Sequence, residues 1–392
     1  MKRLICWMSI PLLFYACSAD KQGAQIFDED GIEIVINPLD PCPEKGEPGT
    51  FETEELFAID TEDENTAELG LTDFGSYAGS YFDVNSQGDI FLYNPENENP
   101  IFFCFDAEGR FQDSFSHRGQ GPGELQRSLN FAIFREGEGM DRLAVTDTQN
   151  NKLVTLDSHG ELIREIRLDS DVQMVFPLPP GNFLVNRRRS DPSGKYLVTY
   201  RLKMAGPDLV DLKELDRQWI PNPLTGEMLK GMYYILSWAV SEDLIFTGFQ
   251  ERDYDIWVFD FSGNPVRKIR KKFRPVPVPA EHKHNFLKQF EAPQFAEILK
   301  KIYFPGGMPA FHSLFCDEEG HLFVRTYEPG NSPGENMVDI FNRKGIFIGR
   351  VSLGGFRDEF GSQVRVRAGR LYQVEEKDSG YKRLVVYRMR WH

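Results

Sequence analysis

The sequence predicts an all-β fold, a single six-bladed β-propeller built from four-stranded antiparallel blades. Three observations predict it: two kinds of turn recur at regular spacing, no helical period runs through most of the chain, and one spare strand precedes the first repeat. A chain of 392 residues would ordinarily suggest two domains. The blades of a propeller stack into one continuous architecture. We therefore expect one propeller domain over residues 51–392.

The first landmark is an apolar strand, a turn with Gly or an acidic residue, and a second strand. Its first copy runs from Phe82–Val84 through Gly88 to Ile90–Leu92. We count six copies, whose turns contain Gly88, Gly139, Gly181, Asp243, Gly320 and Gly369. Each copy predicts the first two strands of one blade.

The second landmark is a turn with Asp or Gly before an outgoing strand. We count five copies, which end at Gly109, Gly160, Gly206, Gly263 and Gly345. The sixth unit ends in Leu384–Tyr387, close to the C-terminus, and has no room for an outgoing strand. Because a ring must close to leave no open edge, an N-terminal strand should complete this blade. Glu55–Asp60 is the candidate.

One insertion breaks the repeat between Arg274 and Pro309. Apolar residues at helical spacing lie within residues 285–302, and Pro293 interrupts them. We expect one short helix from about Pro293 to Ile302. Insertions on one face of a repeat array often build its binding surface, whereas simple packing against the ring is the alternative.

The N-terminus has the pattern of an export signal. Lys2 and Arg3 precede an apolar run that ends at Ala16, which is too short for a membrane-spanning helix. We predict residues 1–16 as a signal peptide. The polar, proline-containing residues 17–50 are expected to form a tether and lead-in.

Leu13–Cys17 resembles the lipobox of bacterial lipoproteins. The resemblance implies that Cys17 carries a lipid and that this lipid is the protein's membrane attachment. It places the protein in the cell envelope, at the outer membrane, on either its periplasmic or its surface side. Cleavage without lipid attachment is the alternative.

The charge balance excludes one class of partner. Cleavage would remove Lys2 and Arg3 but no acidic residue, so the formal net charge of −15 would become −17. Such a surface repels nucleic acid. The basic run over residues 267–274 is a local exception, and we interpret it as Lys and Arg that protect an exposed edge strand from pairing.

Several motifs resemble a known group of propellers. Residues 145–153 resemble the core of an NHL repeat, and His117–Leu125 resembles the glycine-rich blade connector of the same group. This connector is similar to the Gly-Gln-Gly-Pro-Gly-Glu signature of six-bladed β-propeller lipoproteins from Gram-negative gut-type bacteria. Tyr303–Pro305 and residues 316–322 are similar to that group's fifth blade, although the third and fourth blades here lack the Asp-x-x-x-Asn element. The resemblance covers residues 51–392 and implies the fold, but no activity.

We assign a structural role to the most distinctive motif residues. The Asp and Asn of the NHL-like core can bond to the backbone of their own turn, the connector glycines permit positive φ, and the connector proline stiffens it. The connector lacks the strand-to-helix context of a phosphate-binding loop. These structural turn residues are Gly119, Gly121, Pro122, Gly123, Asp147 and Asn151.

The candidate site is the funnel where the innermost strands converge, because concave sites collect polar groups from several blades. The candidate ligand-binding residues of the funnel are Asp83, Asn130, Trp238, His312, Arg365 and Arg367. Arg118 and Glu124 are candidates at its rim. Tyr81, Gln173 and Tyr233 complete the expected lining. The alternative at each position is that the side chain only fills the channel.

No catalytic constellation is recognisable in the sequence. Residues 330–334 fit G-x-S-x-G but lie in a proline-marked loop, and the His282 and His284 pair shows no third metal ligand. We predict a monomeric, non-catalytic binding module without a cofactor, which recognises a glycan, a peptide or a partner protein of the envelope. A purely structural role in an envelope complex is a weaker option.

The alternative function is a metal-dependent hydrolase or lactonase. Gluconolactonase-like propellers hold a divalent metal in the funnel through Glu, Asn and Asp. Asp83 and Asn130 are the counterparts in this chain, and Ca²⁺ would then be the cofactor.

Overall fold

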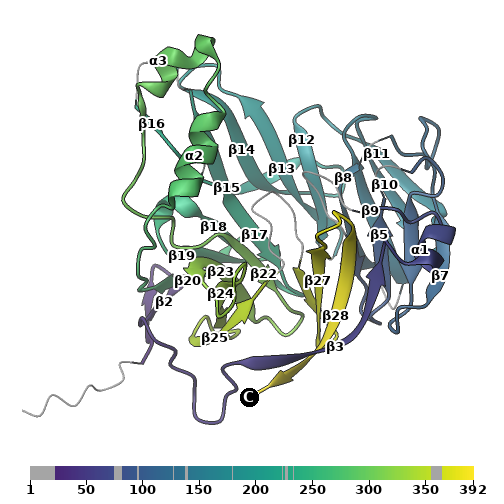
Figure 1. Ribbon diagram of the computed structural model, residues 1–392, viewed down its shortest axis with the longest axis horizontal. Coiled ribbons are helices and arrows are strands. Elements are labelled where there is room, and N and C mark those ends of the chain that lie inside the picture. The colour runs from purple at the N-terminus through teal and green to yellow at the C-terminus, as the bar shows by residue number, and fades with distance from the viewer. Residues whose placement is uncertain are drawn as a thin grey trace, which may run out of the picture.

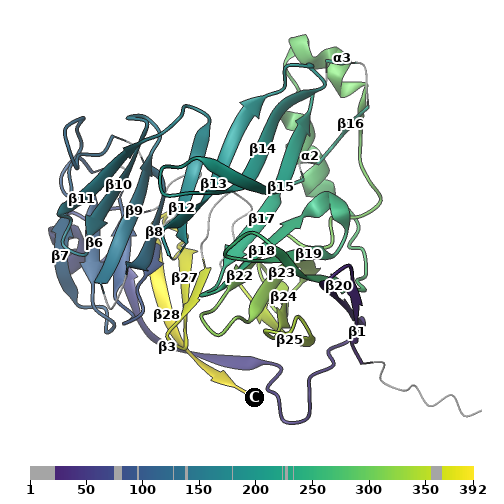
Figure 2. The same ribbon diagram turned by 180° about the vertical axis from the view of Figure 1, so that it is seen from behind.

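The computed structural model describes residues 23–74, 82–94, 97–126, 128–136, 140–178, 180–222, 224–225, 228–232, 234–354 and 364–392. The predicted signal peptide, Cys17, Tyr81, Gly139 and Tyr233 lie outside these residues. Six four-stranded blades stand around a common centre, which confirms the predicted propeller (Figures 1 and 2). Each blade is antiparallel, and the first strands of neighbouring blades contact one another at the centre.

The blades follow one another in chain order. Blade 1 consists of β4 (Phe82–Val84), β5 (Ile90–Tyr93), β6 (Phe102–Phe105) and β7 (Phe111–Phe115). Blade 2 consists of β8 (Ser128–Glu136), β9 (Met140–Asp147), β10 (Lys152–Asp157) and β11 (Leu162–Arg167). Blade 3 consists of β12 (Val172–Leu178), β13 (Asn182–Ser190), β14 (Tyr196–Ala205) and β15 (Asp211–Pro221).

The second half of the ring repeats the pattern. Blade 4 consists of β17 (Leu236–Val240), β18 (Leu244–Phe249), β19 (Asp255–Asp260) and β20 (Pro265–Lys271). Blade 5 consists of β22 (Ser313–Cys316), β23 (Leu322–Pro329), β24 (Asn336–Phe341) and β25 (Phe347–Leu353). Blade 6 consists of β26 (Val364–Arg367), β27 (Arg370–Glu376), β28 (Lys382–Trp391) and, as its outermost strand, β3 (Phe51–Asp60).

The N-terminal strand closes the ring as predicted. β3 pairs antiparallel with β28, and Ile59 lies opposite Leu384. Both side chains are buried in one core cluster with Phe82 of blade 1. The closing strand therefore joins the two ends of the chain through backbone pairing and through apolar packing.

Residues before β3 form a hairpin that the sequence did not predict. β1 (Gln25–Glu29) and β2 (Ile32–Asn37) pair antiparallel, and β2 pairs parallel with β20. The predicted lead-in, residues 17–50, thus contains two strands of the blade 4 sheet. The interpretation of the basic run as protection of an exposed edge strand is wrong, because β2 covers β20.

Asn37 fixes this hairpin to two blades. The side chain is fully buried; its amide donates to the carbonyl oxygens of Gly345 (2.9 Å) and Arg270 (3.2 Å). Its oxygen accepts from the Phe347 backbone N–H at 2.8 Å. The N-terminal segment is therefore attached to blades 4 and 5 before it reaches blade 6.

The recurring turns share one hydrogen bond. Each turn has five residues. The side chain of the first, an Asn or Asp, accepts from the backbone N–H of the fifth at 2.8–3.0 Å, and the fourth is a glycine with φ of 77–93°. This positive φ favours glycine. The turns are Asn85–Asp89, Asp106–Arg110, Asp157–Glu161, Asp260–Asn264, Asp317–His321 and Asn342–Ile346.

The two faces of the ring differ in what they carry. The turn face carries the turns between first and second strands and between third and fourth strands. The connector face carries the segments that join blades and the turns between second and third strands. Every innermost strand begins at the connector face, so the funnel residues near those beginnings lie toward it.

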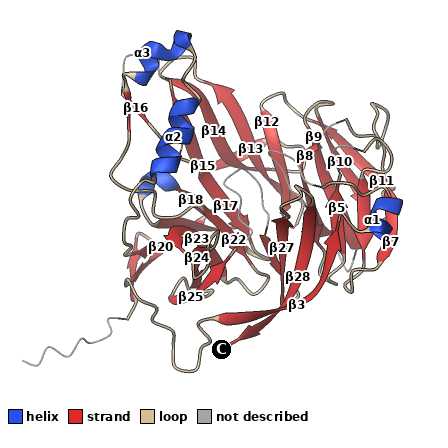
Figure 3. Ribbon diagram, viewed as in Figure 1, coloured by secondary structure: helices blue, strands red, loops and turns tan. Residues whose placement is uncertain are grey.

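The insertion between blades 4 and 5 is helical. It contains α2 (Ala280–Lys288), η2 (Pro293–Phe295), α3 (Ala296–Leu299) and β21 (Ile302–Tyr303), which pairs parallel with β16 (Leu229–Lys230). η2 and α3 lie within the predicted range from Pro293 to Ile302, and α3 is a single turn. The longer helix α2 precedes Pro293 and was not predicted. Helices are few, and α2 and α3 lie beside β14 and β15 of blade 3 (Figure 3).

Two short helical segments lie elsewhere. They are α1 (Glu64–Glu68), which Asp63 caps, and η1 (Gln250–Arg252). In the part of the chain that the structure describes, no helix has the length and apolar character needed to span a membrane.

Candidate functional site

Asp83 lies where three blades meet. It is buried on β4, and one carboxylate oxygen accepts from the Ile133 backbone N–H of β8 at 2.8 Å. The other oxygen accepts from the Val84 N–H at 3.0 Å and lies 3.3 Å from Nε of Arg365 on β26. The structure thus brings two of the predicted funnel residues, Asp83 and Arg365, into an ion pair that joins blades 6, 1 and 2.

The same kind of contact recurs around the ring. A polar side chain of one blade accepts a hydrogen bond from a backbone N–H of the next blade at 2.6–3.1 Å. The pairs are Thr146 with Val175, Gln218 with Leu236, Ser237 with Leu314, and Glu318 with Ala368. Asp83 is one member of this set of inter-blade links, which sequence reasoning did not recognise because each pair is distant in the chain.

His312 precedes the innermost strand of blade 5. Its backbone N–H donates to the Arg325 carbonyl oxygen at 2.7 Å, and Nδ1 lies 3.4 Å from the Arg325 guanidinium. The ring packs edge-on against Tyr327 at 5.4 Å between centroids. Burial, assisted by the positive charge of Arg325, lowers the pKa of His312 to about 3. The imidazole is therefore neutral at physiological pH.

The other predicted funnel residues lie on separate innermost strands. Trp238 of β17 is half-buried and packs edge-on against Phe176 of blade 3, with ring centroids 5.8 Å apart. Asn130 is buried on β8, and Arg367 is half-buried on β26. Gln173 lies on β12.

The rim residues belong to the blade connector. Arg118 Nε donates to the Asn97 carbonyl oxygen at 2.8 Å. Glu124 accepts from the Gly121 N–H at 2.8 Å and lies 3.0 Å from His117 Nε2. The Gly121 bond, followed by the His117 contact, lowers the pKa of the Glu124 carboxyl.

Close approach explains the connector glycines better than φ does. Only Gly123 of the three has a positive φ, 74°, so the expectation was wrong for Gly119 and Gly121. A Cβ atom on Gly119 would come within 1.8 Å of the Glu124 carboxylate. The position therefore excludes a side chain as long as Glu124 bonds to the connector backbone.

Asp147 ties the connector to blade 2. One of its oxygens accepts from the Gln149 and Asn150 N–H groups of its own turn, and the other accepts from the Gln126 N–H at 2.8 Å. Asn151 has a φ of 51°, in the left-handed region that Asn tolerates.

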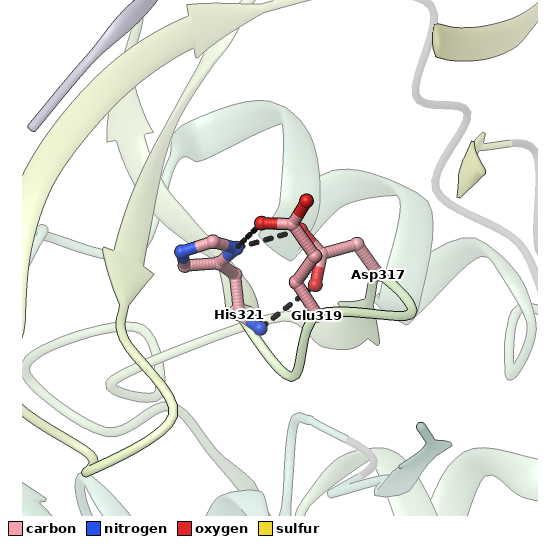
Figure 4. Close-up of side chains that lie close together, drawn as sticks. All are labelled: Asp317, Glu319 and His321. Carbon is pink, nitrogen blue, oxygen red and sulfur yellow. Dashed lines mark hydrogen bonds and ion pairs between the residues drawn. The ribbon is translucent and has the colours of Figure 1, made fainter. Parts of the chain in front are cut away.

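A group of possible metal ligands lies in the turn of blade 5. His321 Nδ1 lies 2.7 Å from Asp317 Oδ2 and 3.9 Å from Glu319 Oε2 (Figure 4). The His321 N–H also donates to Asp317 Oδ1 at 2.8 Å. Burial alone would lower the pKa of His321, but the hydrogen bond and charge of Asp317 outweigh it and raise that pKa. These contacts describe an ion pair that stabilises the turn.

Two cavities lie between or beside blades. One, of about 360 Å³, lies between blades 5 and 6 beside Glu335, Ser352 and Tyr387. The other, of about 650 Å³, lies beside blade 4. Neither is lined by a predicted funnel residue. The sequence signal for the second cavity was the basic run, which we interpreted as edge protection.

Comparison with known proteins supports the fold. Residues 84–205 match a family model described as 6-bladed beta-propeller. Together with the six blades of the structure, this match confirms the six-bladed β-propeller fold that the motifs implied. No curated protein matches the chain.

One solved structure with a TM-score above 0.5 supports the same fold. A member of the DUF4221 family from Bacteroides vulgatus is 13% identical, with a TM-score of 0.53 over 88% of this chain and 99% of that chain. A gluconolactonase from Xanthomonas campestris is 9% identical, with a TM-score of 0.41 over 87% of this chain and 98% of that chain. Likeness at these identities concerns the fold alone.

Proposed function

We propose that the protein is a non-catalytic binding module of the cell envelope. It recognises an extracytoplasmic glycan, peptide or partner protein through the connector face of the propeller. The observation that carries the proposal is the environment of Asp83. Both oxygens of this funnel carboxylate accept backbone N–H groups, and Arg365 lies beside it. This arrangement favours a role in joining blades over proton transfer or metal binding.

The neighbouring charges support this choice. A divalent cation at Asp83 would meet the positive charge of Arg365, whose Nε lies 3.3 Å from the carboxylate. His312 is held neutral by burial and by Arg325. The cavity beside blade 4, in contrast, lies on the connector face, because the turn between the second and third strands and the end of the fourth strand line it. A concave surface with several polar groups is typical of ligand recognition.

The test is an assay for turnover and metal content. Lactone and ester substrates are offered to the purified protein with Ca²⁺, Zn²⁺ or Mn²⁺, and bound metal is measured after mild purification. We expect no turnover that depends on Asp83 and no stoichiometric metal. Turnover that Asp83→Ala abolishes and that the folded variant Arg365→Gln retains would overturn the proposal in favour of a metal-dependent hydrolase.

Membrane attachment is a separate part of the proposal. The lipobox-like segment before Cys17 supports lipid attachment at that residue. Cys17→Ala should move the protein from the membrane fraction to the soluble fraction, as measured by fractionation, whereas Cys42→Ala should not. Retention of the Cys17 variant in membranes would contradict attachment through a single lipid.

A further inference from the structure

The blade 4 cavity is built from two chain segments and one residue of the N-terminal segment. Residues 252–255 form the turn between the second and third strands of blade 4, and residues 270–273 end and follow its outermost strand. Leu39 closes the lining. The volume of about 650 Å³ lies within the usual range of small-molecule sites.

The lining is positively charged on a negatively charged protein. Four cationic and two acidic residues line the cavity, although the chain carries a formal net charge of −15. One of the four cations, Arg252, already forms an ion pair with Asp216 of blade 3. The cationic residues are Arg252, Arg270, Lys271 and Lys272, and the acidic residues are Asp253 and Asp255. A concave surface with low-dielectric walls concentrates such a local field.

Two of these cations are available to a ligand. The Arg270 side chain is 42% exposed, and its Nε lies 3.7 Å from Asp255, which pairs more closely with Lys268 at 2.9 Å. Lys272 is exposed and forms no ion pair within the described residues. Both ammonium and guanidinium groups bind carboxylate, sulfate and phosphate through charge-assisted hydrogen bonds.

A third cation, Lys271, is buried behind the surface of the cavity. The Lys271 side chain is only 1% exposed, and its Nζ lies 3.2 Å from Asp339 and 4.4 Å from the Phe347 ring centroid. The Tyr254 hydroxyl donates to the same Asp339 carboxylate at 2.7 Å. Burial lowers the pKa of Lys271, although Asp339 opposes this effect. These contacts fix both lining segments, residues 252–255 and 270–273, against blade 5.

The backbone at the cavity is strained. Asp253 has φ 57° and ψ −150°, a conformation that glycine adopts far more readily than residues with a side chain. The next residue, Tyr254, is buried and anchored to Asp339, which holds the turn in this conformation. Strain of this kind concentrates at ligand sites, where the surrounding packing maintains it.

The basic residues have no role as edge protection. β2 pairs with β20 along Glu33 to Asn37, so the strand that carries Arg270 and Lys271 is covered. Cations that protect an exposed edge from aggregation are not needed there. Their position around a cavity calls for another explanation.

We propose that the blade 4 cavity binds a small organic anion, a molecule of roughly disaccharide size with a carboxylate, sulfate or phosphate group. The anionic group contacts Arg270 and Lys272, and the body of the ligand lies against Phe273. This inference deepens the proposed function, on which it rests, because it assigns a ligand class to the connector face.

The test is calorimetric titration of the mature, full-length protein at low ionic strength. The probes are a heparin-derived disaccharide, which carries carboxylate and sulfate groups, the neutral disaccharide maltose, and inorganic sulfate. We expect saturable binding of the acidic disaccharide, weaker binding of sulfate and no binding of maltose. Arg270→Gln and Lys272→Gln should each weaken binding of the acidic disaccharide by about tenfold or more.

The control is Lys300→Gln, which removes an exposed lysine directly after α3, outside the cavity, and should leave affinity unchanged. Three outcomes would overturn the cavity assignment: no binding of either anion, equal binding of maltose, or unaltered affinity in both cavity variants. None of these would contradict a binding function at another part of the connector face. Asp83-dependent turnover would remove the proposed function without deciding whether this cavity holds an anion.

Discussion

At the scale of single residues, polar side chains of the ring serve mainly to join one blade to the next. Asp83 accepts from Ile133, and Ser237 accepts from Leu314, so a buried backbone N–H of the following blade is satisfied in each case. An unsatisfied buried N–H would cost about 1–3 kcal/mol. Polar residues at the centre of this propeller therefore have a structural reason to be there, which sequence alone could not distinguish from ligand binding.

His312 predicts a pH dependence of stability. Its folded pKa of about 3 lies below the ordinary value of 6.5, so between these values the unfolded chain binds a proton that the folded protein does not. Stability should therefore rise with pH across this window, by at most about 1.4 kcal/mol per pH unit from this group. Above pH 6.5 the contribution is constant.

Urea unfolding at several pH values between 4 and 7 measures the effect. His312→Asn should flatten the dependence relative to the wild type, while His159→Asn, an exposed control on the turn face, should not. An identical pH dependence in the wild type and in His312→Asn would contradict the buried, neutral imidazole.

At the scale of elements, the sequence predicted the strands and turns that recur from blade to blade. The Asx–Gly turns, such as Asp157 with Gly160, are local and recur, so their spacing revealed the blades. The closing strand β3 was predicted because the sixth blade lacked a fourth strand of its own. The β1–β2 hairpin was not predictable, because β2 pairs in parallel with a strand more than two hundred residues away and repeats nothing.

The insertion and the blade 4 cavity also depend on contacts between segments that are distant in the chain, which the sequence alone does not reveal. Helical spacing predicted a helix after Pro293, where η2 and α3 lie, but it did not predict α2, which begins after Pro279. The Phe286 side chain of α2 packs against Phe304, a contact that the spacing does not reveal. The blade 4 cavity unites residues 252–255 with residues 270–273 and Leu39. Only the fold brings these segments together, so the basic run alone gave no indication of a cavity.

Asn37→Ala tests the attachment of the hairpin. The substitution removes the amide bonds to Gly345 and Arg270 and leaves the buried Phe347 N–H without its acceptor. Stability should fall by about 1–3 kcal/mol. Hydrogen exchange should increase in β1, β2 and the start of β25. The control is Asp28→Ala at the exposed end of β1, where the carboxylate accepts from the Gly31 N–H. An equal effect of the two substitutions would argue against attachment of the hairpin through Asn37.

At the scale of the whole molecule, the protein is a closed ring whose first and last strands meet in blade 6. β3 and β28 pair over most of their length, and their apolar residues share a core with blade 1. Hydrogen bonds between neighbouring blades join the rest of the ring. The connector face is rigid enough to hold preformed cavities only if this closure is intact.

The most direct test of ring closure is native-state hydrogen exchange after residues 55–59 are replaced by a Gly and Ser segment of equal length. The N-terminal hairpin and all other strands remain in place. A closed ring predicts that protection falls together in blade 6 and in blade 1, with a single, less stable unfolding transition. Loss of protection confined to β27 and β28, with unchanged exchange in β5 and β6, would contradict closure of the ring by β3.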